Sequence, residues 1–174
     1  MYTKLKEDKK AKTKAFFFKK EDGVVFNLKL KNLMINYYKK KKEDVRICLH
    51  QSSLDKHHDM IILQQKKNYY RPHKHLTKGE TYHMIVGSML CILFNQIGKI
   101  KKVVKIKKNE IFRVPRNTVH TMVPVSKYTI YHENKPGPFI KKGDSIIPKW
   151  ANKCLNKTSL VIELKKFNKK INGK

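Results

Sequence analysis

The chain has 174 residues, three cysteines and a formal net charge of +28, and its length suits one domain that buries a core without disulfides. The cysteines form no C-x-x-C pair, and Phe16–Phe18 is too short an apolar run for a signal peptide or a membrane span, so we expect a cytoplasmic protein with reduced thiols. Only four basic residues are arginine, and the lysines are spread in pairs as on a solvated surface, so nucleic acid is not an expected partner despite the charge.

Residues 1–44 are expected to form an N-terminal extension. Residues 1–14 are almost wholly polar and predict a loose segment. The runs AFFFKK (15–20) and VVF (24–26) flank a Glu-Asp-Gly turn and predict a pair of strands.

A short amphipathic helix is predicted over residues 28–39. Its apolar side chains follow the i, i+3, i+4, i+7 spacing of one helix face: Leu30, Leu33, Met34 and Tyr37. The lysine run 39–42 then lies at the C-terminal end, where cations suit the helix dipole.

Residues 45–150 consist of short segments rich in Val, Ile, Tyr and Phe, separated by turn residues. The strand-like segments are RICLH (46–50), DMIILQQ (59–65), YYRPHKH (69–75), TYHMIVG (81–87), SMLCILFN (88–95), IKKVVKI (100–106), EIFRVP (110–115), TVHTMVPV (118–125) and KYTIYHE (127–133). Short strands about ten residues apart predict an all-β sandwich or barrel, with Gly98 in a hairpin loop. The remaining residues, 151–174, form a basic tail in which SLVIEL (159–164) suits either an edge strand or a helix.

Two clusters in this domain carry metal-binding chemistry. His73 and His75 are two residues apart on a predicted strand, so both imidazoles project from one face, and Glu80 opens the next strand after a bend. His120 begins a strand about forty residues later. Three imidazoles and one carboxylate suit a divalent ion such as Fe, Mn, Zn or Ni and leave coordination positions open for water, substrate or dioxygen.

The spacing of these residues resembles the two motifs of the cupin superfamily. H-x-H, four residues, Glu, six residues and Gly resembles the first motif, and Pro-x-x-x-x-His resembles the second: His73, His75, Glu80 and Gly87, then Pro115 and His120. The glycines expected in the second motif fall at Asn109 and Asn117, and asparagine is the residue that best replaces glycine in left-handed turns. The resemblance implies a cupin fold, a double-stranded β-helix or jelly-roll barrel, with a short N-terminal helix and extensions.

Over roughly residues 15–150 the chain also resembles the WbuC-type cupin metalloproteins. The matching stretches are RICLH (46–50), HDM (58–60), RPHKH (71–75), SKYTIYHE (126–133), GPF (137–139) and PKWA (148–151). This resemblance implies a link to bacterial surface-polysaccharide (O-antigen) sugar metabolism and a small, sugar-like substrate. It assigns no reaction.

Further side chains are candidates for substrate binding or proton transfer. Arg71 shares strand parity with His73 and suits a substrate anion, and Tyr82 shares the inward parity of Glu80. His50 is a third candidate for substrate contact. His132 and Glu133 are candidate acid or base groups, because the family topology places their strand beside that of His50.

Three functions remain open on this evidence. The first is a metal-dependent protein that acts on or binds a free or nucleotide-linked sugar, the second an Fe(II)-dependent dioxygenase, and the third a non-enzymatic module that binds a small molecule. A homodimer is also expected, since AFFFKK would otherwise leave an exposed sheet edge.

Overall fold

The computed structural model describes residues 5–9, 11, 13–19, 23–68, 70–140, 143–153 and 157–172. Cys154 and most of the expected turn at 21–23 lie outside the described residues. The elements are β1 (Leu5–Glu7), β2 (Lys14–Phe18), α1 (Leu28–Lys41), β3 (Val45–Cys48), β4 (His57–Gln65), β5 (Glu80–Val86), β6 (Ser88–Phe94), β7 (Ile100–Lys107), β8 (Ile111–Val114), β9 (Val119–Pro124), β10 (Tyr128–Pro136), α2 (Lys149–Lys153) and α3 (Lys157–Asn172).

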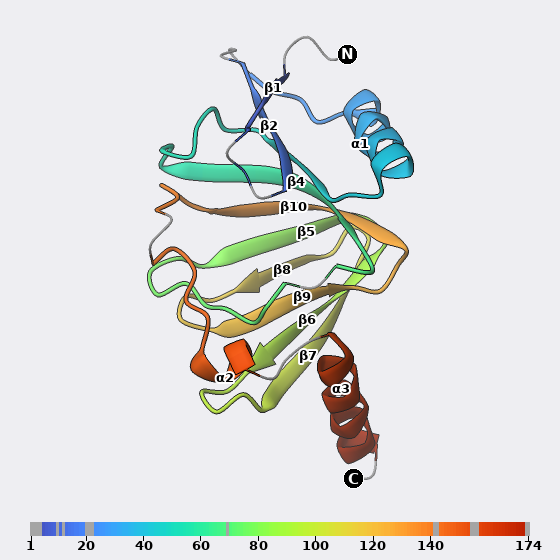
Figure 1. The fold of residues 1–174 in the computed structure, drawn as a ribbon, viewed down its shortest axis with the longest axis vertical. Coiled ribbons are helices and arrows are strands. Elements are labelled where there is room, and N and C mark those ends of the chain that lie inside the picture. Colours follow the sequence, from blue (N-terminus) through green and yellow to red (C-terminus); the bar gives the residue numbers. More distant parts are fainter. Residues whose placement is uncertain are drawn as a thin grey trace.

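The strands form two sheets, which lie one above the other in the view of Figure 1. Buried apolar and polar side chains fill the interior between them. The larger has the strand order β1-β2-β3-β4-β10-β5-β8 and the smaller the order β7-β6-β9. The side chains that fill the space between them come from both sheets, for example Met84 on β5, Cys91 on β6 and Met122 on β9. This is the two-sheet jelly-roll arrangement, so the all-β fold predicted from the strand spacing is confirmed.

Eight of the nine predicted segments of the barrel contain a strand, and the exception is residues 69–75. Within the described part, 70–75, only His73 and Lys74 make isolated bridges, to His120 and Ile146 respectively. Pro72 has no backbone N–H, and the two bridges lead to different partners, so this segment crosses between elements instead of joining one sheet.

The N-terminal extension differs from the prediction. Residues 24–26 form no strand, and β2 instead pairs with β1 on one side and, in parallel, with β3 on the other. β1 lies in the segment that was expected to be loose. Because β2 is covered on both edges, it leaves no free edge of the kind from which a homodimer was expected.

The two longer helices, α1 and α3, pack on the outside of the barrel, α1 near β3 and β4 and α3 near β7 (Figure 1). The predicted helix at 28–39 is confirmed as α1, which buries Leu30, Met34 and Tyr38 and begins where the Asn27 side chain accepts a hydrogen bond from the backbone N–H of Leu30. The stretch SLVIEL (159–164) lies within α3, so it is a helix and not an edge strand. Leu160 of α3 is buried in an apolar cluster with Ile92 of β6.

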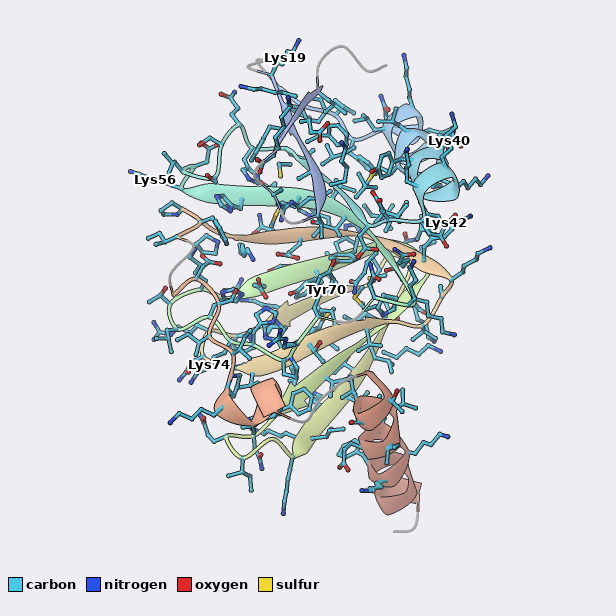
Figure 2. All side chains as sticks on the ribbon, viewed as in Figure 1. Lys19, Lys40, Lys42, Lys56, Tyr70 and Lys74 are labelled. Atoms are coloured by element: carbon cyan, nitrogen blue, oxygen red, sulfur yellow. The ribbon has the colours of Figure 1, made fainter. Side chains whose placement is uncertain are left out.

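Among the described residues, no helix combines the length and apolarity needed to cross a membrane. The lysines labelled in Figure 2, including Lys19, Lys40, Lys56 and Lys74, lie at separate places around the outline of the molecule.

Asn109 and Asn117 both adopt the left-handed conformation predicted for them, with φ of 68° and 58°. We expect Asn117→Ala to lower the free energy of unfolding by about 1 kcal/mol, because alanine pays a steric cost at positive φ. Asn117→Gly should stay within about 0.5 kcal/mol of the parent, because glycine tolerates this conformation. Urea unfolding of both variants tests this, and equal stabilities for the alanine and glycine variants would contradict it.

Candidate metal centre

The crossing segment 70–75 brings two histidines to the interior. Tyr70 is labelled near the centre of Figure 2. Its hydroxyl donates a hydrogen bond to the Asp44 carboxylate, and its backbone carbonyl accepts one from the Thr121 hydroxyl of β9. Three residues later, His73 and His120 exchange both backbone hydrogen bonds, at 3.0 and 2.9 Å. This bridge fixes the segment against β9, so the two cupin-like motifs meet in space.

Three of the four predicted ligands present their ligand atoms within 4.8 Å of one another: His73, His75 and Glu80. His120 is not in that group of three, but its Nε2 lies 2.9 Å from Glu80 Oε2. The other oxygen, Oε1, lies 2.9 Å from His75 Nε2. His75, Glu80 and His120 are each at most 2 % exposed, so this is a polar cluster inside the barrel.

The three imidazoles are oriented alike. Each Nδ1 faces a backbone carbonyl, that of Arg71 for His73, Asp144 for His75 and Thr118 for His120. A carbonyl oxygen can only accept, so each Nδ1 carries the hydrogen and each Nε2 of a neutral ring has a free lone pair. This is the arrangement found in metal-ligating histidines, whose second nitrogen donates to a carbonyl or carboxylate.

The close contact between His75 and Glu80 requires a proton or a cation between the two groups. Nε2 of His75 is buried and makes no well-formed hydrogen bond, although it lies close to a Glu80 oxygen. A lone pair facing a carboxylate is repulsive unless a proton or a metal ion lies between them. The residues present therefore fit a divalent ion, and His73, His75 and Glu80 are the side chains that could hold it, with His120 beside them.

Burial and charge shift the ionisation of the cluster. Burial, with the charge of His120, lowers the pKa of His73 to about 4, so this ring stays neutral at pH 7. Burial would also lower the pKa of His75, but close contact with Glu80 outweighs burial and raises it. Burial would raise the pKa of Glu80, yet the Lys135 ammonium and the two histidines hold it well below its usual range. The carboxylate is thus charged and ready to bind a cation.

Tyr82 points inward, as its strand parity predicted, and reaches the cluster. It is 3 % exposed, and its hydroxyl donates to Glu80 Oε2 at 2.8 Å. Burial, with the charge of Glu80, raises its pKa well above the usual value, so it remains a phenol. Tyr82 is therefore placed to hold the Glu80 carboxylate in position.

The other candidates are placed differently from the predictions. Arg71 is exposed. Strand parity does not turn its side chain toward the cluster, because its segment is not a strand. The backbone carbonyl of Arg71 contacts the cluster instead, at His73 Nδ1. His50 stacks on His58 with ring centroids 4.2 Å apart, and its Nδ1 lies 3.0 Å from the carbonyl of Asp59. His50 thus contacts β4, and its role in substrate contact stays a prediction.

His132 and Glu133 lie on opposite faces of the larger sheet, because consecutive strand residues alternate. His132 faces outward, where its Nε2 lies 2.8 Å from Asp59 Oδ1. Glu133 faces inward, 3.1 Å from Lys135 Nζ, and only this member of the pair can take part in chemistry at the cluster. The expectation that both act there is therefore corrected.

Sequence reasoning missed two lysines beside the cluster. Lys135 Nζ donates to Glu80 Oε1 at 2.9 Å. Lys78 Nζ lies 2.5 Å from Asp144 Oδ1 and donates to the carbonyl of Pro138 at 2.6 Å. In a chain with so many lysines, no local pattern distinguishes these two. Lys135 shares strand parity with Glu133, but parity does not say which side of the strand faces the interior.

A segment that we call the strap (residues 137–147, described at 137–140 and 143–147) runs from the end of β10 to the His73–His75 segment. Its backbone bonds Lys56, Ser53 and Lys74 through Gly137, Phe139 and Ile146. Asp144 of the strap is 7 % exposed and supplies the carbonyl that holds His75 Nδ1. Lys78 therefore ties the strap at two points, Pro138 and Asp144, to the loop that follows His75.

Comparison with known proteins places these features in context. The profile of a family described as "Domain of unknown function (DUF6016)" matches residues 30–106, which is under half of the chain. No curated protein matches the sequence.

Solved structures give further likenesses. KdgF from Halomonas sp. is 12% identical, with a TM-score of 0.46 over 56% of this chain and 82% of that one. An uncharacterized conserved protein with a double-stranded beta-helix domain from Klebsiella pneumoniae is 13% identical, with a TM-score of 0.48 over 63% and 87%. The capsular polysaccharide assembling protein CapF from Staphylococcus aureus is 12% identical, with a TM-score of 0.48 over 60% of this chain and 31% of that one. At this level of similarity the likenesses carry no functional argument; the strand order and the two sheets make this chain an all-β protein with the two-sheet jelly-roll arrangement.

Proposed function

We propose that this chain is a cupin metalloprotein that binds one divalent ion at His73, His75, Glu80 and His120. The observation that carries the proposal is the common orientation of the three imidazoles, whose Nδ1 atoms face carbonyls while the Nε2 atoms of His75 and His120 approach the Glu80 carboxylate. The unit that carries this function is the barrel of residues 45–150, with residues 1–44 and 151–174 as extensions.

The ligand set suits Fe, Mn, Zn or Ni, and such an ion supplies Lewis-acid polarisation of an oxygen atom when bound. The protein's own residues do the rest. Tyr82 and Lys135 orient the Glu80 carboxylate by hydrogen bonds. Three backbone carbonyls fix the tautomers of the histidines, and the interior position of the cluster excludes bulk water.

For the substrate we propose a sugar, free or nucleotide-linked, of bacterial surface-polysaccharide metabolism. The support for this is the resemblance to WbuC-type cupins over residues 15–150. A panel of sugar nucleotides added to the metal-loaded protein should raise its melting temperature for at least one member. If none does so, the sugar assignment fails, and oxygen uptake with Fe(II) and a reductant then tests the dioxygenase alternative.

Elemental mass spectrometry of untagged protein tests the metal site. After loading in turn with iron, manganese, nickel and zinc, the parent should retain close to one ion per chain. A His73→Ala/His75→Ala variant should retain none, because it loses two of the ligands. A His83→Ala variant is the matched control, because this residue of β5 has the parity opposite to Glu80 and Tyr82. Absence of metal from the parent after every loading would reject the proposal and favour a non-enzymatic binding module.

A further inference from the structure

A partly buried lysine reaches into the barrel next to the proposed metal ligands. Lys135 is near the end of β10, and its side chain is 14 % exposed. Its Nζ lies 2.9 Å from Glu80 Oε1 and 3.1 Å from Glu133 Oε1. The ammonium is therefore held between two carboxylates, one of which is a proposed metal ligand and the other not.

The charges of this interior do not balance when a metal is present. Glu80, Glu133 and Lys135 together carry one net negative charge, and Lys78 with Asp144 forms a separate neutral pair. Metal-ligating histidines are neutral. A divalent ion added to this group leaves one net positive charge in a buried site, where an uncompensated charge is costly.

We propose that Lys135 makes the metal-loaded site select an anionic ligand, so that the substrate carries a carboxylate or phosphate oxygen that the ammonium and the ion hold together. This inference rests on the proposed metal site and names the class of substrate that the site takes. One bound anion restores neutrality to the interior. The lysine, with three donor hydrogens, has one left for the anion after its contacts with Glu80 and Glu133.

The proposal predicts two effects of opposite sign when Lys135 is replaced by methionine. Removal of a like charge near the ion should tighten divalent-metal binding by about tenfold or more, since like charges in a protein interior repel strongly. Removal of the same charge should weaken anion binding to the loaded protein by about tenfold or more. A lysine that only stabilises the fold would not give this pattern, because loss of structure weakens both.

The experiment uses Co²⁺, whose visible absorption reports its coordination, and two anions, acetate and inorganic phosphate. Co²⁺ is titrated first and each anion second, into the parent, Lys135→Met, Lys135→Arg and the control Lys166→Met, an exposed lysine of α3. The parent, Lys135→Arg and Lys166→Met should bind an anion similarly, and Lys135→Met should bind Co²⁺ more tightly and the anion more weakly. A response to acetate assigns a carboxylate substrate, and a response to phosphate assigns a phosphorylated one.

A second measurement needs no variant. In the parent, saturating acetate or phosphate that binds at this site should lower the apparent Kd for Co²⁺ by about threefold or more, because the two ligands are thermodynamically coupled. Equal anion affinity in the parent and Lys135→Met, or no anion effect in the parent, would overturn the inference while Co²⁺ still binds. Failure of Co²⁺ to bind at all would reject the metal site and this inference with it.

Discussion

Replacing Glu80 by glutamine should lower the free energy of unfolding of the metal-free protein by about 3 kcal/mol, which is typical for loss of one partner from a buried ion pair. The carboxylate is 2 % exposed and accepts hydrogen bonds from Lys135 and Tyr82. Glutamine keeps the shape of the side chain and removes its charge. Among the residues that the structure describes, the Lys135 ammonium then retains Glu133 as its one anionic partner.

Urea unfolding in the presence of a chelator measures this effect. Glu163→Gln is the matched control, because its carboxylate is half exposed and pairs with Lys166 within one helix, where such pairs contribute about 0.5 kcal/mol or less. A Glu80→Gln variant as stable as the parent would show that the carboxylate is not charged in the folded protein. It would also remove the anionic ligand from the proposed metal site.

Replacing Lys78 by methionine should lower the free energy of unfolding by about 3 kcal/mol, because it leaves the buried Asp144 carboxylate without its cation. Oδ2 of Asp144 already has no hydrogen-bond partner, so no other donor compensates for the loss. The strap should also open more often, since Lys78 holds Pro138 and Asp144 together. Hydrogen exchange at the amides of Asp144 and Ile146 should become faster.

The double variant Lys78→Met/Asp144→Leu separates the ion pair from the packing of the strap. Removal of both charges should recover most of the loss, because two apolar side chains of similar size leave no buried charge. Lys166→Met, at an exposed pair, should change stability by less than about 0.5 kcal/mol. If the single variant unfolds at the same urea concentration as the parent, Lys78 does not hold the strap.

Local patterns in the sequence predicted most of the strands and the left-handed turns. Composition rich in Val, Ile, Tyr and Phe, interrupted by turn residues, marked eight of the nine barrel segments, and Asn109 and Asn117 stood where cupin motifs have glycine. The segment predicted as a strand at 69–75 forms isolated bridges, and no strand, in its described part, 70–75. Its composition is strand-like, but its backbone partners are distant in sequence: His120 lies on β9 and Ile146 in the strap.

The candidate site was predicted in part. The motif spacing led to His73, His75, Glu80 and His120, and strand parity led to the inward position of Tyr82. Strand parity also predicts that His132 and Glu133 point to opposite faces of the sheet, because they are neighbours on one strand. The sequence does not say which of these faces lies toward the barrel interior. The packing of α1 on the outer face of the larger sheet decides this, because the side chains it covers, such as Ile61 and Ile130, share the parity of His132.

The sequence by itself determined the all-β architecture, the turns and the four proposed metal ligands, because segment composition, turn chemistry and motif spacing are local properties of the chain. The tertiary structure decided which charges surround those ligands. Lys135 meets Glu80 because β10 pairs with β5, and Asp144 meets Lys78 and His75 because the strap returns across the end of the barrel. Contacts between residues 55 to 69 positions apart leave no periodic signal in the chain. These pairs form because burying a charge costs free energy unless an opposite charge lies beside it.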